Sequence, residues 1–165
     1  MTRKHRLLVL CVTSLICVLS VQVHGQVTSQ RLVAASSEPQ NWLTYSGDYQ
    51  SHRFSLLDQI TPANVKNLKL QWVYQSPVAG NWQTTPLVVD GIMYITQRPN
   101  DVVALDAVTG RAFWIYRYTP NPNRIVCCGA NNRGVAIAGD TLFMGTLDAN
   151  LIAIDAKSGR QLWKT

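Results

Sequence analysis

The sequence predicts an all-β fold, a β-propeller built from four-stranded blades, of which the chain holds about two. The first observation is a repeat: residues 104–114 read ALDAVTGRAFW and residues 153–163 read AIDAKSGRQLW, 49 positions later. The second is that each copy follows two short apolar runs separated by a Gly/Asp turn, PLVVDGIMYIT (86–96) and VAIAGDTLFMG (135–145). Four short strands that recur every 40 to 50 residues or so are typical of propeller blades.

The first 25 residues are typical of a cleaved secretion signal. Basic residues precede an uncharged apolar run, residues 7–21, which is shorter than the roughly twenty residues that span a bilayer. Val23 and Gly25 suit the positions that a signal peptidase reads, so we expect cleavage after Gly25. The mature chain would then be exported and without a stable membrane span; an uncleaved anchor is the alternative.

Removal of the signal also removes much of the positive charge of the chain. Three of the fifteen Lys and Arg residues lie in the signal, and none of the nine Asp and Glu residues does, which leaves the mature chain with a formal charge of +3. The remaining basic residues are scattered rather than clustered. An ordinary solvated surface accounts for them, and no nucleic-acid partner is indicated.

The segment before the repeat is less regular. Residues 59–68, QITPANVKNL, predict a short helix, because Thr61 can cap it and Pro62 suits the first helical position. Trp72, in LKLQWVY, precedes Trp114 by 42 residues. We expect it to end a strand of a blade whose other strands come from elsewhere in the protein.

Within each blade, two strands joined by a tight turn are followed by a third strand, VVALD or LIAID. The fourth strand is predicted to end at Trp114 in one blade and at Trp163 in the other. Each of these Trp side chains offers a large flat surface to a neighbouring blade, and its indole N–H needs a hydrogen-bond partner. We therefore interpret both as structural residues.

Asp106 and Asp155 occupy equivalent positions of the repeat, just before a Thr-Gly or Ser-Gly turn. A short polar side chain can bond the backbone across such a turn, while Gly takes a positive φ. Their equivalence indicates turn residues rather than catalytic carboxylates.

Several other site types find no support in the sequence. No glycine-rich loop joins a strand to a helix in the pattern that binds nicotinamide or flavin dinucleotides. The mature segment contains one histidine, His52, and one glutamate, Glu38. It therefore has no clustered zinc-ligand set and no visible nucleophile with a base.

Cys127 and Cys128 are the two cysteines that remain after removal of the signal. An exported protein reaches an oxidising compartment, where a disulfide between these neighbours can persist. Two alternatives stay open on composition alone. The pair can serve as small buried hydrophobic side chains, or it can bond to cysteines in a part of the protein outside this chain.

The length of the chain conflicts with a complete propeller. A ring closes with about four to eight blades, whereas residues 26–165 hold about two. We therefore expect an amino-terminal part of a longer propeller, inactive and poorly folded when made alone because its blade edges would be unpaired. A small domain completed by oligomerisation is the alternative.

The stretch VCCGANNRG (126–134), the blade repeats and the upstream WLTYSGDYQSHRFSLLDQITPANVKNLKLQWVY (42–74) together resemble one known family. They are similar to the amino-terminal part of the quinoprotein alcohol dehydrogenases, periplasmic eight-bladed propellers that use pyrroloquinoline quinone. The resemblance covers about residues 41–165. Its most specific part is the pair of adjacent cysteines with Arg at the fifth position after them.

The resemblance implies four cofactor-binding positions. Cys127 and Cys128 match a pair whose disulfide forms a small ring over one face of the quinone. Arg133 matches an arginine that contacts the redox-active quinone oxygens. Gln83, in NWQTTPLVVDG, stands where many members carry a glutamate that borders the cofactor. The substitution keeps a carbonyl acceptor, adds donors and removes the charge.

The reaction implied by the resemblance is oxidation of an alcohol to an aldehyde or ketone. A base takes the hydroxyl proton, hydride passes to the quinone, and calcium or a lanthanide acts as Lewis acid. Electrons then pass to a cytochrome c or quinone acceptor. The catalytic aspartate and the metal ligands are expected in later blades, so neither a catalytic nor a metal-ligating residue is assigned within this chain.

Two other functions remain as alternatives. A non-catalytic propeller scaffold, of the kind used in outer-membrane assembly, explains the signal and the repeats but not the combination of Cys127, Cys128 and Arg133. A sugar dehydrogenase that uses the same quinone is the alternative among enzymes. The adjacent cysteines favour the alcohol branch.

Overall fold

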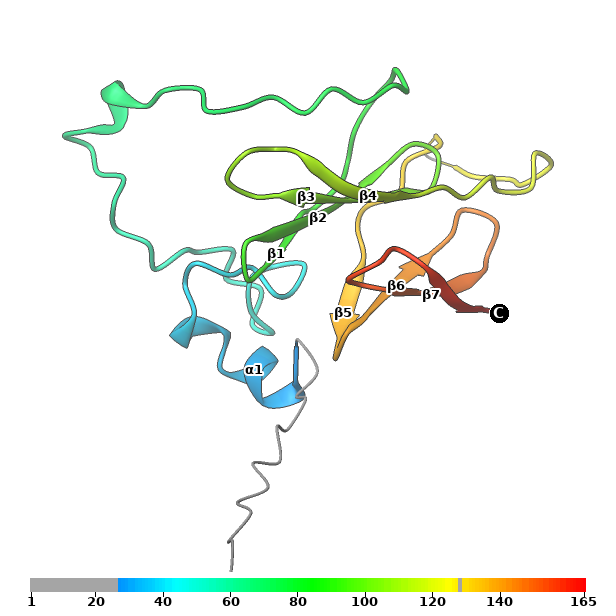
Figure 1. Cartoon of the computed structure of the whole chain (residues 1–165), viewed down its shortest axis with the longest axis horizontal. Helices are drawn as coiled ribbons and strands as arrows, with labels where there is room; N and C mark the ends of the chain where they lie inside the picture. The colour runs from blue at the N-terminus through cyan, green and yellow to red at the C-terminus, as the bar shows by residue number, and fades with distance from the viewer. Residues whose placement is uncertain (1–26, 128) are drawn as a thin grey trace, which may run out of the picture.

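The computed structural model describes residues 27–127 and 129–165, and its main feature is a pair of four-stranded antiparallel sheets (Figure 1). The predicted signal, residues 1–25, and Cys128 lie outside the described residues. Within the described ranges, no helix has the length and apolar character needed to cross a membrane.

Each sheet is formed by four consecutive strands, in spatial order along the chain, as expected for a propeller blade. The first contains β1 (Leu87–Val89), β2 (Ile92–Gln97), β3 (Asp101–Asp106) and β4 (Ala112–Tyr116). The second contains β5 (Ala136–Ala138), β6 (Thr141–Gly145), β7 (Leu151–Asp155) and β8 (Gln161–Lys164). The all-β architecture of repeated blades is confirmed. The helical elements are short: α1 (Ser29–Val33), η1 (Ala35–Ser37) and η2 (Val65–Asn67).

The fourth strand of each blade continues beyond the predicted end. β4 runs two residues past Trp114, because Val102 of β3 still offers a pairing partner to Tyr116. β8 runs one residue past Trp163, where Lys164 pairs with Ile152 of β7. The predicted strand ends were therefore wrong by one or two residues.

The helix predicted over residues 59–68 is reduced to the single 3-10 turn η2. The side chain of Asn64 accepts a hydrogen bond from the Thr61 N–H at 2.7 Å and donates to the Gln59 carbonyl at 2.7 Å. Such local bonds compete with helical ones. Asn64, and not the Thr61 hydroxyl, therefore organises this turn.

Trp72 lies in no strand of the described structure; because its partner strands are predicted to come from elsewhere in the protein, that strand stays a prediction. Among the described residues, the backbone of residues 69–79 forms no hydrogen bond with other backbone groups. The packing role of Trp72 is nevertheless as expected of a blade Trp. Its indole N–H donates to the Ala107 carbonyl at 3.2 Å, and its ring lies so close to Gly110 that an added Cβ would meet it at 2.4 Å.

Trp114 repeats this contact between the two blades. Its indole N–H donates to the Ala156 carbonyl at 3.2 Å, and a Cβ added at Gly159 would meet its ring at 2.6 Å. The Trp at the end of one blade thus packs flat on the Gly turn of the next. This confirms the structural interpretation of Trp114, and that of Trp163 stays a prediction.

Both repeated aspartates act in turns, as predicted. Asp106 accepts hydrogen bonds from two backbone N–H groups of its turn, at 2.8 and 3.0 Å, and Gly110 has φ of +71°. Asp155 accepts from the backbone N–H and the hydroxyl of Ser158, at 2.8 and 2.7 Å, and Gly159 has φ of +72°. These hydrogen bonds hold the pKa of each carboxyl below its ordinary value.

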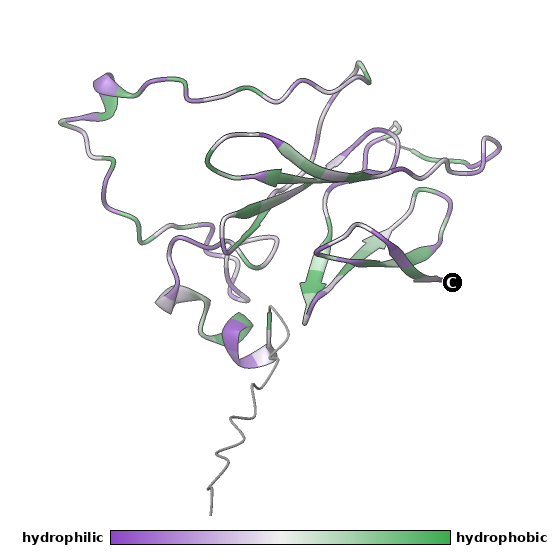
Figure 2. Cartoon of the chain, in the orientation of Figure 1, coloured by the Kyte–Doolittle hydropathy of each residue, from purple (hydrophilic) through white to green (hydrophobic). Residues whose placement is uncertain are grey.

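The core lies within and between the blades, where the strands are most hydrophobic (Figure 2). The amino-terminal segment contributes to it and joins both sheets. Val27, 1% exposed, pairs with Gly139 beside the second sheet, while Trp42 pairs with Val88 of β1. This segment therefore fixes the two blades relative to one another.

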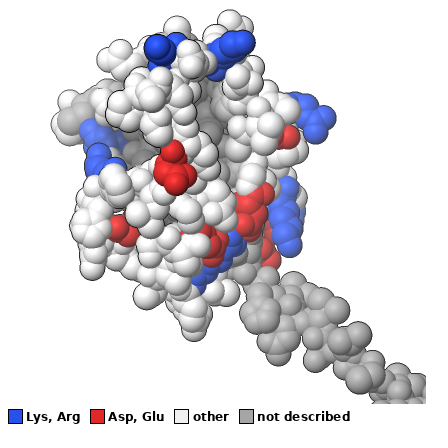
Figure 3. Space-filling view, turned by 90° about the vertical axis from the view of Figure 1, so that its left-hand side faces the viewer, with Lys and Arg blue, Asp and Glu red and all other residues white. Residues whose placement is uncertain are grey.

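A cluster of charged residues links the amino-terminal segment to the turn between β1 and β2. The Arg31 guanidinium forms ion pairs with Glu38, at 2.6 Å, and with Asp90. Asn41 donates to Glu38 at 2.7 Å and accepts from the Asp90 N–H at 2.9 Å. Arg31 is thus neutralised by two carboxylates. Elsewhere, on the face drawn in Figure 3, charges of both signs are scattered rather than gathered into one patch.

Candidate functional site

The predicted cofactor residues lie on two segments that come together beside the first blade. Gln83 precedes β1, and Cys127 and Arg133 lie in the connection from β4 to β5. Cys127 is exposed. Because Cys128 lies outside the described residues, the predicted disulfide remains a prediction.

A side-chain hydrogen bond joins Gln83 to Arg133, fifty positions apart in the sequence. The Arg133 Nε–H donates to the Gln83 Oε1 at 3.1 Å. The backbones of the two segments also meet, since the Thr85 N–H donates to the Arg133 carbonyl at 3.0 Å. The structure therefore brings together two residues that the sequence predicted to share a site.

Asn132 fixes the loop that carries Arg133. Its buried side chain donates to the Asn100 Oδ1 at 3.1 Å and to the Gly145 carbonyl at 2.8 Å, and accepts from the Gly134 N–H at 3.0 Å. Its carbonyl accepts from the Thr96 hydroxyl at 3.1 Å. Asn132 was not identified from the sequence, because an Asn in a short Gly-containing stretch such as GANNRG (129–134) is equally typical of a solvated loop.

The segment that carries Gln83 is anchored to β2. The Thr84 hydroxyl oxygen accepts from the Thr96 N–H at 2.9 Å and bonds the Thr96 hydroxyl at 3.0 Å. Gly134, with φ of +132°, allows the two segments to approach, since an added Cβ would lie 3.0 Å from the Thr85 carbonyl oxygen. Thr84, which follows Gln83, and Asn132, which precedes Arg133, are thus both held in place by hydrogen bonds to the blades.

A hollow of about 330 Å³ opens beside Arg133. It is lined by Tyr45, Asn131, Asn132, Arg133, Gly134, Gly145 and Leu147. Arg133 supplies its charge, and no carboxylate appears in this lining. The Asn131 Oδ1 is buried without a hydrogen-bond partner among the described residues. Charged donors beside an unsatisfied acceptor suit an oxygen-rich anion that also carries a donor.

Tyr45 is a second residue that sequence reasoning missed. It stands at the rim of the hollow, half-exposed, with the Arg53 guanidinium carbon 5.2 Å from the centre of its ring. Interaction with Thr85 and Arg53, together with the charge of Arg133, holds the pKa of the Tyr45 hydroxyl below its ordinary value. Two arginine side chains, Arg53 and Arg133, therefore lie near the Tyr45 side chain at this rim.

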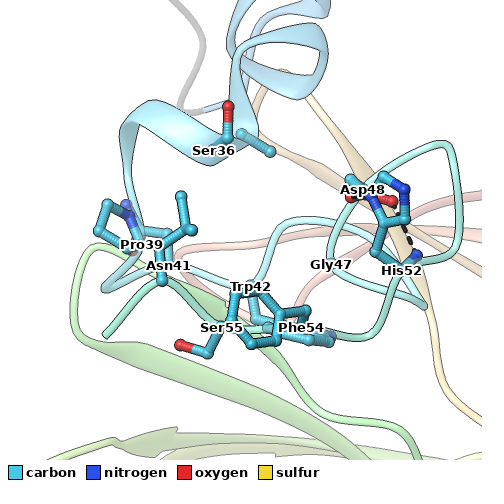
Figure 4. A pocket seen from close by; sticks show the side chains of 11 residues that line it. Ser36, Pro39, Asn41, Trp42, Gly47, Asp48, His52, Phe54 and Ser55 are labelled. Carbon is cyan, nitrogen blue, oxygen red and sulfur yellow. Dashed lines mark hydrogen bonds and ion pairs between the residues drawn. The ribbon is translucent and has the colours of Figure 1, made fainter. Parts of the chain in front are cut away.

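A second hollow, of about 370 Å³, lies in the amino-terminal segment and contains none of the predicted site residues (Figure 4). Trp42, Phe54 and Leu56 are among its lining residues. The polar pair beside them is local: Asp48 bonds the His52 ring at 2.6 Å and also accepts from the His52 backbone N–H at 3.1 Å. A turn accounts for this pair.

No group of three or more His, Cys, Asp or Glu side chains in residues 27–127 and 129–165 gathers where it could hold a metal ion. Arg133 is the charged side chain in the lining of the candidate site.

Comparison with known proteins places this site in context. A family model described as "Glucose/ethanol/alcohol dehydrogenase, beta-propeller domain" matches residues 42–164. The dehydrogenase subunit of a quinone-dependent alcohol dehydrogenase from Gluconacetobacter polyoxogenes is 41% identical over 138 residues, which cover 82% of this chain and 19% of that protein. A protein named 1-butanol dehydrogenase (cytochrome c), from Thauera butanivorans, is 39% identical over 140 residues, with 84% and 20% covered.

Solved structures agree with these matches. The quinohemoprotein alcohol dehydrogenase ADHIIG of Pseudomonas putida superposes with a TM-score of 0.78 at 39% identity, over 87% of this chain and 21% of that one. A europium-containing methanol dehydrogenase superposes with a TM-score of 0.76 at 35% identity, over 82% and 24%. The chain spans about a fifth of the length of the curated relatives it matches. Since the family model covers most of its residues, the chain belongs to the glucose/ethanol/alcohol dehydrogenase family of β-propeller domains.

Proposed function

We propose that the whole protein is a dehydrogenase that depends on pyrroloquinoline quinone and oxidises an alcohol to an aldehyde or ketone. The observation that carries this proposal is the position of Arg133, which Gln83 holds at a hollow whose lining contains no carboxylate. Similarity to alcohol dehydrogenases supports alcohol rather than sugar as the substrate class.

Gln83, Cys127, Cys128 and Arg133 are the proposed cofactor-binding residues. The quinone, when bound, supplies a two-electron acceptor for the alcohol. Arg133 would donate hydrogen bonds to the oxygen atoms of the quinone and would favour its reduced, more negative form. A disulfide between Cys127 and Cys128 would hold the quinone from one side.

The base and the metal ligands are proposed to lie outside this chain. The similar methanol dehydrogenase contains europium, in keeping with calcium or a lanthanide as the Lewis acid. A catalytic aspartate in a later blade would take the hydroxyl proton. Within this chain, the contribution to catalysis is to bind and orient the cofactor.

A cytochrome c or a quinone is the proposed electron acceptor. The Thauera relative is named as a cytochrome c-linked enzyme, and the Gluconacetobacter relative as a quinone-linked one. The cleaved signal predicted for residues 1–25 supports a periplasmic location for the protein.

An activity assay tests this proposal. The full-length protein, loaded with pyrroloquinoline quinone in calcium or a lanthanide, should reduce an artificial dye when primary or secondary alcohols are added. Glucose should be a poor substrate. If the quinone does not bind and no alcohol supports dye reduction with any of these metals, the proposal is wrong.

The disulfide has its own test. Trypsin should release residues 125–133, IVCCGANNR, which carry both cysteines. In the purified protein this peptide should resist alkylation until it is reduced. Alkylation without reduction, or a crosslink to another peptide, would show that the two cysteines are not bonded to each other.

A further inference from the structure

We propose that Gln83 is a positioning residue that aims Arg133 at an anionic ligand without neutralising it. Gln83 contacts the Nε of the guanidinium and leaves both terminal amino groups, and the full positive charge, to the ligand. The inference rests on the proposed function, because the ligand meant is a planar quinone that carries carboxylates.

The contacts of Arg133 are the first argument. Among the described residues, the hydrogen bond from its Nε to Gln83 is the one made by its side chain, and it takes part in no ion pair. A guanidinium presents further N–H groups in a fixed fork that matches a carboxylate. Because Gln83 binds only the Nε–H, the two terminal amino groups of Arg133 can still donate to a ligand carboxylate.

Arg31 shows what a carboxylate partner does in the same chain. Its guanidinium binds Glu38 and Asp90 together, and these contacts raise its pKa far above the ordinary value. Arg31 is therefore a structural clamp whose donors and charge are occupied. Arg133, with a carboxamide partner, remains available.

The residues around Arg133 also distinguish it from Arg31, which is paired with two carboxylates. The lining of the adjacent hollow includes Tyr45 and Asn131 but no Asp or Glu. Arg53 lies over the ring of Tyr45 and adds a second positive charge at the rim. A carboxylate at position 83 would be the first negative group in direct contact with Arg133 among the described residues. A neutral Gln at this position leaves the positive charge of Arg133 to attract an anion.

The test is the affinity of the full-length, quinone-depleted protein for pyrroloquinoline quinone in the presence of calcium, measured by calorimetry. Gln83→Leu removes the acceptor, and we expect about fivefold weaker binding. Gln83→Glu converts the contact into an ion pair that competes with the ligand, and should bind more weakly still. Gln71→Glu, which adds the same charge at an exposed site outside the hollow, should bind as the unsubstituted protein does.

A double-mutant cycle shows whether Gln83 acts through Arg133. In an Arg133→Met background, Gln83→Leu should cause less than about a twofold further loss, whereas independent contacts would give losses that multiply. Multiplying losses, or Gln83→Glu binding as tightly as the unsubstituted protein, would overturn this inference alone. If the unsubstituted protein fails to bind the quinone, the proposed function fails with it. Should Gln83→Leu not fold, Gln83→Asn, which shortens the carboxamide arm, replaces it in the cycle.

Discussion

Two neighbouring asparagines at the candidate site, Asn131 and Asn132, differ in the hydrogen bonds that their side chains make. The side chain of Asn132 is buried and bonds three groups on separate segments, whereas the Asn131 Oδ1 is buried and has no partner among the described residues. A buried acceptor without a partner costs desolvation free energy and adds no stability. Asn132 therefore fixes the loop through hydrogen bonds, whereas the Asn131 Oδ1 does not.

Replacement of each asparagine by Ala should separate these roles. Asn132→Ala leaves the Gly134 N–H without its side-chain partner and removes one of the two hydrogen bonds to the Asn100 Oδ1, so the free energy of unfolding should fall by about 2 to 4 kcal/mol. Asn131→Ala should change it by less than about 0.5 kcal/mol. Chemical denaturation of the full-length variants measures both values. Equal losses at the two positions would show that the loop is not fixed through Asn132.

Asp148 should make stability depend on acidic pH. Burial opposes its ionisation, but hydrogen bonds from the Thr146 hydroxyl at 2.6 Å, the Asn121 N–H at 2.8 Å and the Tyr118 hydroxyl at 3.0 Å outweigh burial. They hold the pKa of Asp148 well below its ordinary value of 3.8. Because the folded-state pKa is lowered, this stabilisation is complete above pH 3.8 and is lost as the pH falls below it.

Asp148→Asn should therefore lower stability at neutral pH and flatten the loss of stability below about pH 4. Asp58→Asn, at an exposed carboxylate without a hydrogen bond among the described residues, is the control. Denaturation midpoints between pH 3 and pH 7, or thereabouts, measure both profiles. A profile for Asp148→Asn that runs parallel to that of the unsubstituted protein would contradict this account.

At the scale of the elements, the contact between a Trp and a Gly turn holds neighbouring blades together. Gly159 has φ of +72°, and a Cβ added there would meet the Trp114 ring at 2.6 Å. Gly139 has a similar φ of +59°, but an added Cβ would meet nothing within 4 Å. A side chain at either position would strain the backbone, but only a side chain at Gly159 would also clash with the Trp114 ring.

Gly139→Ala should cost about 1 to 2 kcal/mol, the strain of a side chain in the left-handed region. Gly159→Ala should cost at least about 1 kcal/mol more, since the indole must also shift from its place. The difference between the two unfolding free energies measures the blade contact. If it is near zero, Trp114 does not depend on the Gly turn.

The elements that repeat could be predicted from sequence, and those that do not repeat could not. Duplicated turn and strand patterns located all eight strands to within a few residues, because each copy supports the other. The helix expected over residues 59–68 was largely replaced by a side-chain turn at Asn64, which periodicity does not reveal.

The candidate site shows the same division. Arg133 and Gln83 were found through family motifs, and the structure joins them. The hydrogen bond between Asn132 and Asn100 joins residues that are 32 positions apart, and no local sequence pattern predicts such a pair. Tyr45 reaches the hollow from a distant segment for the same reason.

For the whole molecule, the series of Trp contacts predicts a further blade. Trp72 packs on the first blade and Trp114 on the second, so Trp163 is expected to pack on a third. Here Trp163 is 44% exposed. In the full-length protein it should be buried.

Trp163→Ala should therefore lower the unfolding free energy of the full-length protein by about 3 to 5 kcal/mol, as for a buried Trp. Phe113→Ala removes a ring of similar exposure, 48%, that is not part of the Trp series, and should cost much less. Denaturation curves of the two variants provide the comparison. Equal, small losses would contradict the predicted blade contact.

The hollow beside Arg133 and the adjacent cysteines are proposed to hold the quinone. A crystal structure of the full-length protein grown with pyrroloquinoline quinone and calcium would test this proposal. We expect the quinone against Cys127 and Cys128, with its oxygen atoms within hydrogen-bond distance of the terminal amino groups of Arg133. A quinone bound elsewhere, or with Arg133 turned away from it, would show that the proposed site is wrong.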